Sequence, residues 1–359
     1  MDQRLQLLKE LTEVDGISGY EYAVRDVLRR HLQGVAEEAG QDHLGSLAFR
    51  HVGTAPQPRI MLSGHMDEIG FMVNLITPEG YIKFVPVGGW WDQVLLGQRV
   101  VVKAAGGDVP GIIGSKPPHI LPEEERKKVV EKKDMFIDVG ARDRKEAMEV
   151  FGIRPGDPIV PVSPFTVLKN PRMVLAKAWD DRLGCALFIE TLKELSRVDH
   201  PNTLYGVGTT QEEVGLRGAQ TAADLVNPDI CIATDVGIAG DMPGVKEEEA
   251  PVKLGAGPVL YVLDARLIPN RKLKDLFMET ARQENLPLQF ATMPGGATDG
   301  GAITVHGQGV PAVSYGVPVR YIHTHAGIIH LDDVDAAVKL LVAVIRRLDA
   351  ATVAEIQKA

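Results

Sequence analysis

Hydrophobic residues recur along this chain with two kinds of spacing, and the balance between them changes in the middle. Toward both ends, short apolar runs such as 59–64 and 203–210 alternate with segments such as 181–195 whose apolar residues recur at helical spacing. Runs this short between turn residues are typical of buried strands, and the periodic segments are typical of amphipathic helices. The alternation predicts an α/β fold with an open mixed sheet flanked by helices.

The same criteria place the other elements of this fold. We expect helices at about 1–14, 21–32, 218–225, 272–284 and from 333 to the end, and strands at 173–178, 229–234 and 311–315. The pattern differs between about residues 70 and 162, where short β-type runs are separated by turns that contain glycine. The simplest architecture is one α/β domain made of residues 1–69 and 163–359, with a small β-rich domain of residues 70–162 inserted in it.

Composition and charge narrow the choice of protein class. The chain has 359 residues and a net charge of −9, and no basic stripe indicates a nucleic-acid partner. Its apolar runs are shorter than the ~18 residues of a membrane span, and its first residues resemble an amphipathic helix more than a signal peptide. Cys185 and Cys231 form no pattern typical of disulfides or zinc knuckles. We expect a cytoplasmic protein without a membrane partner. One charged loop, residues 122–134, is interpreted as a solvated excursion.

Side chains that bind metals follow five of the apolar segments. They are His65, Asp180, Glu213, Asp235 and His323. Ligands of open α/β sheets bind at the carboxyl ends of the strands, so we expect these five side chains at one edge of the sheet. Imidazoles and carboxylates suit zinc and similar ions. Five ligands exceed the usual set of one catalytic zinc and suit two ions roughly 3.5–4 Å apart, with one carboxylate as a bridge.

Each of these side chains also has an ordinary structural explanation. The aspartates at 180–181 could cap the next helix, and the glutamates at 212–213 could be solvated residues at a helix start. A single histidine such as His65 is more often structural than a ligand. Asp235 is harder to explain in this way, because a buried carboxylate needs a partner. We favour a metal site because the structural explanations would require five coincidences of position.

Two neighbouring carboxylates indicate how the site would work. Asp67 is two residues from His65, so in an extended segment both side chains point to one face, and Asp67 can accept the second ring N–H of His65. Glu212 directly precedes Glu213, and adjacent residues cannot easily bind the same ion. Because a metal lowers the pKa of its bound water toward ~7, Glu212 is our candidate general base and acid.

In their order along the chain, these segments resemble the glutamyl, deblocking and tetrahedral aminopeptidases, a family of dinuclear metallopeptidases. The resemblance rests on GISGYE, SGHMDEIG, GIIGSKPPH, AWDDRLG, TTQEEVGLRGA, ATDVG, GGATDGGA and RYIH, which cover essentially the whole chain. It implies a zinc-aminopeptidase-like fold in which the inserted β-rich domain contributes to assembly. It also implies a homo-oligomer, which in relatives is a hollow tetrahedral dodecamer that admits only short peptides.

The resemblance implies a role for each ligand. Asp180 would bridge the two ions, of which one would also take His65 and Asp235 and the other Glu213 and His323. In relatives the aspartate that matches Asp180 precedes an unusual cis peptide.

Two further roles and one departure follow from the same comparison. Glu212 would be the catalytic base, and Asp67 would lie behind the metal ligands. Many relatives continue the RYxH motif with Ser-Pro, whereas this chain continues with residues 324–327, Thr-His-Ala-Gly. His325 therefore competes with His323, which we retain because it matches the RYxH spacing; His325 could instead line the substrate pocket. The glycine-rich segment 295–301 is either a flexible turn or a loop that faces the substrate.

We therefore expect an aminopeptidase that hydrolyses N-terminal residues of short peptides with free N-termini, through a dinuclear metal-bound hydroxide and with Glu212 as the general base. The cofactors would be two divalent ions per subunit, zinc or cobalt in the first place and manganese in the second. A deacylase or other amidase of the same clan would share the metal site but fail on free N-termini. A glycosidase with paired carboxylates would need no metal. A non-catalytic scaffold is disfavoured because every ligand type and Glu212 are present.

Overall fold

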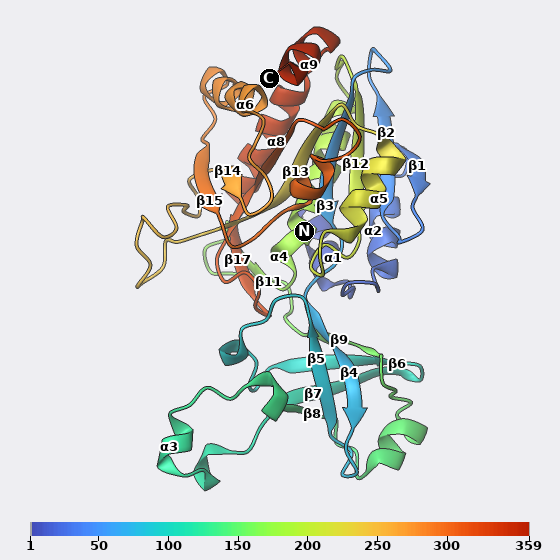
Figure 1. Cartoon of the computed structure of the whole chain (residues 1–359), viewed down its shortest axis with the longest axis vertical. Coiled ribbons are helices and arrows are strands. Elements are labelled where there is room, and N and C mark those ends of the chain that lie inside the picture. Colours follow the sequence, from blue (N-terminus) through green and yellow to red (C-terminus); the bar gives the residue numbers. More distant parts are fainter. Residues whose placement is uncertain (1, 359) are drawn as a thin grey trace.

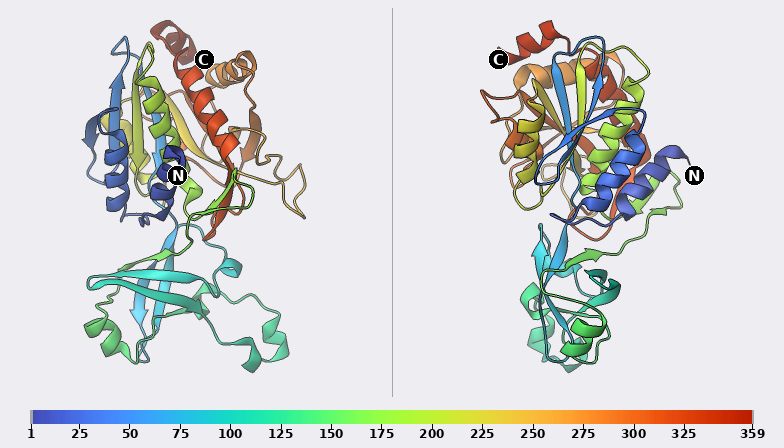
Figure 2. Two further views of the ribbon diagram at one scale, coloured as in Figure 1. Left: turned by 180° about the vertical axis from the view of Figure 1, so that it is seen from behind. Right: turned by 90° about the vertical axis from the view of Figure 1, so that its right-hand side faces the viewer.

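The chain forms an α/β part and a β-barrel, and the computed structural model describes residues 2–358 (Figure 1). The α/β part contains an eight-stranded mixed sheet with helices on both faces, so the fold class predicted from the sequence is confirmed. The chain enters the barrel after the strand that ends at His65 and returns to the α/β part after Pro161. Figure 2 shows the barrel as a separate body at one end of the α/β part.

Four parallel strands form the middle of the large sheet. In spatial order the sheet contains β1 (Glu37–Gln41), β2 (Leu47–Val52), β12 (Thr203–Thr209), β3 (Arg59–His65), β13 (Ile230–Ile238), β16 (Ala312–Val319), β14 (Val259–Asp264) and β15 (Gln289–Met293). β12, β3, β13 and β16 are parallel to one another and are almost entirely buried, whereas the pairs β2–β12 and β16–β14 on either side of them are antiparallel. Helices on both faces require such continuous apolar strands. The carboxyl ends of the four strands therefore meet at one edge.

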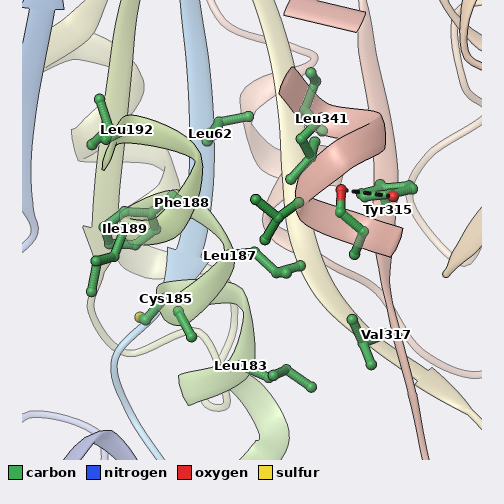
Figure 3. Close-up of a cluster of buried hydrophobic side chains, with 14 of the residues drawn as sticks. Leu62, Leu183, Cys185, Leu187, Phe188, Ile189, Leu192, Tyr315, Val317 and Leu341 are labelled. Carbon is green, nitrogen blue, oxygen red and sulfur yellow. Dashed lines mark hydrogen bonds between the residues drawn. The ribbon is translucent and has the colours of Figure 1, made fainter. Parts of the chain in front are cut away.

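The helices cover this sheet in two sets. One face carries α1 (Gln3–Glu13), α2 (Tyr22–Leu32), α4 (Trp179–Leu195), α6 (Arg271–Gln283), α8 (Leu331–Ile345) and α9 (Ala350–Gln357), and the other carries α5 (Arg217–Val226) and α7 (Asp299–Ile303). On the first face, Leu187 and Phe188 of α4 pack in a core with Leu62 of β3 and Leu341 of α8 (Figure 3). The hydroxyl of Tyr315 in this core donates to the Ala337 carbonyl, so the polar atom keeps a partner.

The barrel has a hydrophobic core of its own. Around it the strands follow the closed order β4 (Gly70–Ile76), β5 (Ile82–Val87), β8 (Phe136–Asp138), β7 (Gly107–Gly114), β6 (Arg99–Ala104) and β9 (Pro158–Pro161). The core includes Phe71, Trp90 and Ile137. The predicted excursion 122–134 is mostly exposed and contains the short helix α3 (Glu123–Arg126). A third, small sheet contains β10 (Thr166–Val167), β11 (Met173–Ala176) and β17 (Gly327–His330).

The structure differs from the predicted elements at the C-terminal helix and in strands that the pattern did not indicate. The continuous helix expected from residue 333 to the end is wrong, because the chain breaks between α8 and α9. Asp349 starts α9 by accepting the N–H of Thr352 at 2.7 Å, which is an N-cap. Strands β1, β2, β14 and β15 were not predicted. No helix within residues 2–358 is both long and apolar enough to cross a membrane.

Candidate active site

The five predicted ligands gather at the carboxyl edge of the parallel strands, although not all of them at strand ends. His65 is the last residue of β3, Glu213 lies in the turn after β12, and His323 lies in the loop after β16. Asp235 lies within β13, three residues before its end. Asp180 comes from the first turn of α4, which follows β11 of the small sheet. Helix α4 therefore carries a candidate ligand that we had expected from the edge of the large sheet.

Asp180 lies between the two histidines. Its Oδ1 is 3.0 Å from Nε2 of His65, and its Oδ2 is 3.3 Å from Nε2 of His323. Nε2 of His323 is also 3.5 Å from Oε1 of Glu213. One carboxylate oxygen facing each imidazole is the geometry that a bridging ligand requires. By contrast, the side chain of His325 makes no hydrogen bond or ion pair with these side chains within the described residues, and its buried Nδ1 has no hydrogen-bond partner there.

The second aspartate of the Asp180-Asp181 pair caps the next helix, as the structural explanation allowed, and has a further role that the sequence did not indicate. The peptide bond between the two is cis, as the resemblance implied. Asp181 is fully buried; its carboxylate accepts the N–H of His65 at 3.0 Å and the N–H of Gly184 at 2.8 Å. Its ligand atom also lies within 4.8 Å of those of His65 and Asp235. Asp181 thus caps the first turn of α4 and fixes the backbone of a candidate ligand.

Asp67 is placed behind the site, with different contacts from those predicted. The Nδ1 atom of His65 lies 3.0 Å from the Asp67 backbone carbonyl and 3.5 Å from the Asp67 carboxylate. The carboxylate instead accepts the backbone N–H groups of Glu212 at 3.0 Å and Glu213 at 3.1 Å, and the hydroxyl of Ser18 at 2.6 Å. Asp67 therefore ties the segment of His65 to the turn that carries both glutamates.

The site contains more buried carboxyl groups than its two histidines can neutralise. Burial, reinforced by neighbouring carboxylates, raises the pKa of three carboxyl groups well above their ordinary values, in Asp181, Glu212 and Asp235. It also raises the pKa of Glu213 to about 8. Burial lowers the pKa of His323, but the adjacent Asp180 and Glu213 outweigh it and raise that pKa to about 10.

One buried carboxylate oxygen of the candidate ligands also lacks a hydrogen-bond partner among the described residues. This atom is Oε1 of Glu213, and the ligand atoms of His65, Asp180 and Glu213 lie within 4.8 Å of one another. Nitrogen and oxygen donors that converge in a strongly acidic, buried site fit divalent cations. The residues present therefore fit the metal ions that the sequence led us to expect.

A cleft of about 640 Å³ opens onto these side chains. Its walls include the apolar side chains of Ile238, Met293 and Ile322 and the charged side chains of Glu249 and Arg266. The glycine-rich segment 295–301 contributes its first three residues to the wall, whereas Thr298 and Asp299 are buried. The lining residues of this cleft do not include His325.

Three elements that carry candidate ligands touch one another without intervening side chains. A Cβ atom on Gly64 of β3 would lie 2.6 Å from the carbonyl carbon of Gly184 in α4, and a Cβ on Gly184 would lie 2.2 Å from the carbonyl oxygen of Thr234 in β13. Glycine is required at both positions because the backbones are in contact. The segments of His65, Asp180 and Asp235 are consequently held against one another directly.

Comparison with known proteins finds relatives that are named aminopeptidases. The glutamyl aminopeptidase of Lactococcus lactis subsp. cremoris is 35% identical over 98% of this chain and 98% of its own. The lysyl aminopeptidase of Pyrococcus furiosus is 34% identical over 96% of this chain and 97% of its own.

Solved structures show the same fold. The TET aminopeptidase of a marine sediment archaeon of the Thaumarchaeota superimposes with a TM-score of 0.96 at 48% identity, covering 99% of both chains. The TET1 peptidase of Pyrococcus horikoshii, which assembles into a tetrahedron or a large octahedral shell, superimposes with a TM-score of 0.85 at 32% identity, covering 96% of this chain and 100% of its own. Residues 45–340 match the sequence model of the M42 glutamyl aminopeptidases, and the chain belongs to this family.

Proposed function

We propose that this protein is a dinuclear metalloaminopeptidase that removes N-terminal residues from short peptides. The observation that carries the proposal is the position of Asp180, which presents one carboxylate oxygen to His65 and the other to His323. Membership of the M42 glutamyl aminopeptidases supports the aminopeptidase activity. His65, Asp180 and Asp235 would hold one ion, and Asp180, Glu213 and His323 the other.

The ions would be zinc or cobalt in the first place and manganese in the second. When bound, they would polarise the scissile carbonyl and lower the pKa of a coordinated water. The alternative functions are a same-clan amidase and a metal-independent glycosidase, and the first experiment distinguishes them from an aminopeptidase.

Glu212 would move the proton in this reaction. It is buried beside the ligands and lines the cleft, with its Oε2 3.8 Å from Nε2 of His65. Because Asp67 holds the N–H of Glu212, the backbone that carries this carboxylate is fixed. Glu212 would accept the proton of the attacking water and return it to the leaving amine. Burial raises the pKa of Glu212 well above the ordinary carboxyl value, which makes it a stronger base when ionised.

The first experiment is hydrolysis of a panel of aminoacyl chromogenic substrates before chelation, after chelation, and after zinc, cobalt or manganese is added back. We expect activity to disappear on chelation and to return with metal. Activity on no free N-terminus, with two ions demonstrably bound, would favour a same-clan amidase. Cleavage of glycosides that survives chelation would favour the glycosidase.

The role of Glu212 has its own test. Glu212→Gln keeps the size of the side chain and removes the base, so we expect kcat to fall roughly 10²–10⁴-fold while both ions still bind. Glu248→Gln, an exposed residue outside the cleft, is the matched control. A Glu212→Gln variant with wild-type turnover would contradict the assignment of the base.

We also propose that the protein assembles into a homo-oligomer through its barrel. The TET peptidases with the same fold support this. The barrel exposes large apolar side chains, among them Ile120 at 64% and Val150 at 71%. Sedimentation velocity at several protein concentrations should give a mass well above the 38.9 kDa of one chain; a monomer at every concentration would contradict the proposal.

A further inference from the structure

His323 is the least enclosed of the candidate ligands. Its side chain is 37% exposed, compared with 2% for His65 and 5% for Glu213. It also lies in an irregular loop after β16, where its φ of 53° is left-handed, so no strand or helix fixes its direction. The orientation of its ring must therefore depend on what the ring contacts.

The nearest such contact comes from the barrel. Nδ1 of His323 lies 2.8 Å from the carbonyl oxygen of Gly89, in the loop that follows β5. A carbonyl can only accept, so Nδ1 must carry the proton. In the neutral ring, Nε2, which faces Asp180 and Glu213, then carries the lone pair that a metal ion would bind. The Gly89 carbonyl thus selects the tautomer of the ring as well as its direction.

Two glycines allow the loop to approach this closely. A Cβ atom on Gly88 would lie 3.1 Å from Oε2 of Glu213, and one on Gly89 would lie 3.0 Å from Nδ1 of His323. Neither position has room for a side chain unless the neighbour moves. The backbone of the barrel loop therefore forms one wall of the site.

The barrel holds this loop in place through Trp90 and Lys132. The indole of Trp90 is buried, donates to the Gly70 carbonyl at 3.0 Å, and stacks on Phe71 with ring centres 4.8 Å apart. The ammonium group of Lys132 donates to the Trp90 carbonyl at 2.8 Å and pairs with Asp92. The Lys132 backbone N–H also donates to Asp92 at 3.1 Å.

We infer that the loop Gly88–Asp92 is the positioning element for His323, and that Trp90 and Lys132 are positioning residues that act on the ion held by His323 and Glu213. The inference rests on the proposed dinuclear site and goes beyond it. It gives the barrel a part in building the catalytic centre that is separate from assembly. Lys132 belongs to the charged excursion 122–134, which the sequence pattern indicated to be solvated, with a partner contact as the alternative.

The test is isothermal titration calorimetry, in which zinc is added to the metal-free full-length chain. It compares wild type with Lys132→Met, Gly89→Ala and Lys132→Arg. We expect wild type to bind two ions. Lys132→Met and Gly89→Ala should weaken one of them about 10–100-fold and leave the other unchanged, which is the usual effect of losing a group that orients a ligand. Lys132→Arg should restore most of the affinity. Excess zinc should restore the kcat of Lys132→Met.

The matched control is Lys133→Met, because this neighbouring side chain is 71% exposed and pairs only with Glu131 among the described residues. Gly89→Ala keeps the inference testable if Lys132→Met fails to fold, since it perturbs the ring of His323 directly. Two unchanged affinities in folded Lys132→Met and Gly89→Ala would overturn the inference. Fewer than two ions bound to wild type would instead overturn the proposed dinuclear site.

Discussion

At the scale of single residues, the carboxylate of Asp67 organises the site without belonging to the ligand set. It accepts three hydrogen bonds, from the N–H groups of Glu212 and Glu213 and from the hydroxyl of Ser18. Bonds to a buried carboxylate are charge-assisted and stronger than neutral ones. The proposed base and one proposed ligand therefore share a single support.

We predict that Asp67→Asn lowers kcat or metal affinity about 10–100-fold, because an amide cannot accept all three donors at once. Ser18→Ala removes only one of these bonds and should have a much smaller effect. Steady-state kinetics at saturating metal and zinc titration of both variants are the measurements. Equal effects of the two substitutions would argue against a shared support.

The residue types and spacing of the candidate ligands were readable from the sequence, but the contacts of Asp67 were not. A metal-binding residue type that directly follows an apolar run can be recognised within a few residues of sequence, as in the segments of His65 and Glu213. The bond between Asp67 and Glu212 joins residues 145 positions apart, and no local pattern reports it. The same holds for Gly89, whose carbonyl meets a side chain 234 positions away.

At the scale of elements, a histidine pair joins β2 to the segment before β12. The side-chain amide of Asn202 donates to the carbonyls of Ile345 and Leu348, so its oxygen faces Nδ1 of His200 at 2.9 Å and accepts from it. Nε2 of His200 is then unprotonated and accepts from Nδ1 of His51 at 3.0 Å. Three chain segments are thus linked through fixed tautomers.

This pair predicts a dependence of stability on pH. Burial, and then the neighbouring His200, lower the pKa of His51 below its ordinary value near 6.5. The unfolded chain therefore takes up a proton at a higher pH than the folded chain does. The contribution to stability is complete above about pH 6.5 and is lost as the pH falls toward the folded pKa of His51.

We expect the unfolding temperature of His51→Gln to fall less between pH 7 and pH 5 than that of wild type. His43→Gln, which changes an exposed histidine, should follow wild type. Thermal unfolding at fixed protein and metal concentrations is the measurement. A His51→Gln curve parallel to wild type would show that the pair does not set this pH dependence.

Long periodic elements were predicted well, and the misses have physical causes. The break between α8 and α9 was missed because apolar spacing continues through Leu348, while the cap at Asp349 is the competing local signal. The edge strand β1 was missed because its residues, Glu37–Gln41, are mostly exposed and lack alternation. Edge strands are defined by pairing with a neighbour more than by their own pattern.

At the scale of the whole molecule, a chain of charges connects the barrel to the core of the α/β part. Lys103 of β6 pairs with Asp15 at 3.0 Å, Asp15 with Lys177 at 3.0 Å, and Lys177 with Glu68 at 2.6 Å. Lys177 and Glu68 are 4% and 1% exposed, whereas Lys103 is 31% exposed. Burial alone raises the pKa of Asp15, but Lys177 and Lys103 outweigh it and lower that pKa.

The two lysines should therefore differ greatly in their contribution to stability. Lys177→Met leaves Glu68 buried without its nearest cation, and we predict a loss of about 3–5 kcal/mol. Lys103→Met removes two partly exposed ion pairs, with Asp15 and with Asp108, and should cost no more than about 1 kcal/mol. Urea denaturation of metal-saturated protein at one fixed protein concentration compares them. Equal losses would contradict the distinction between buried and exposed links.

The contact between Gly64 and Gly184 has a consequence for transferring this centre to another scaffold. Copying the seven side chains of the candidate site would not be enough, since the alignment of β3, α4 and β13 depends on two positions that have no side chain. A methyl group at either glycine would separate elements that carry His65, Asp180 and Asp235. Tolerance to substitution at the site is thus set by the distance between backbones, and a recipient scaffold must bring its backbones equally close before the ligands are added.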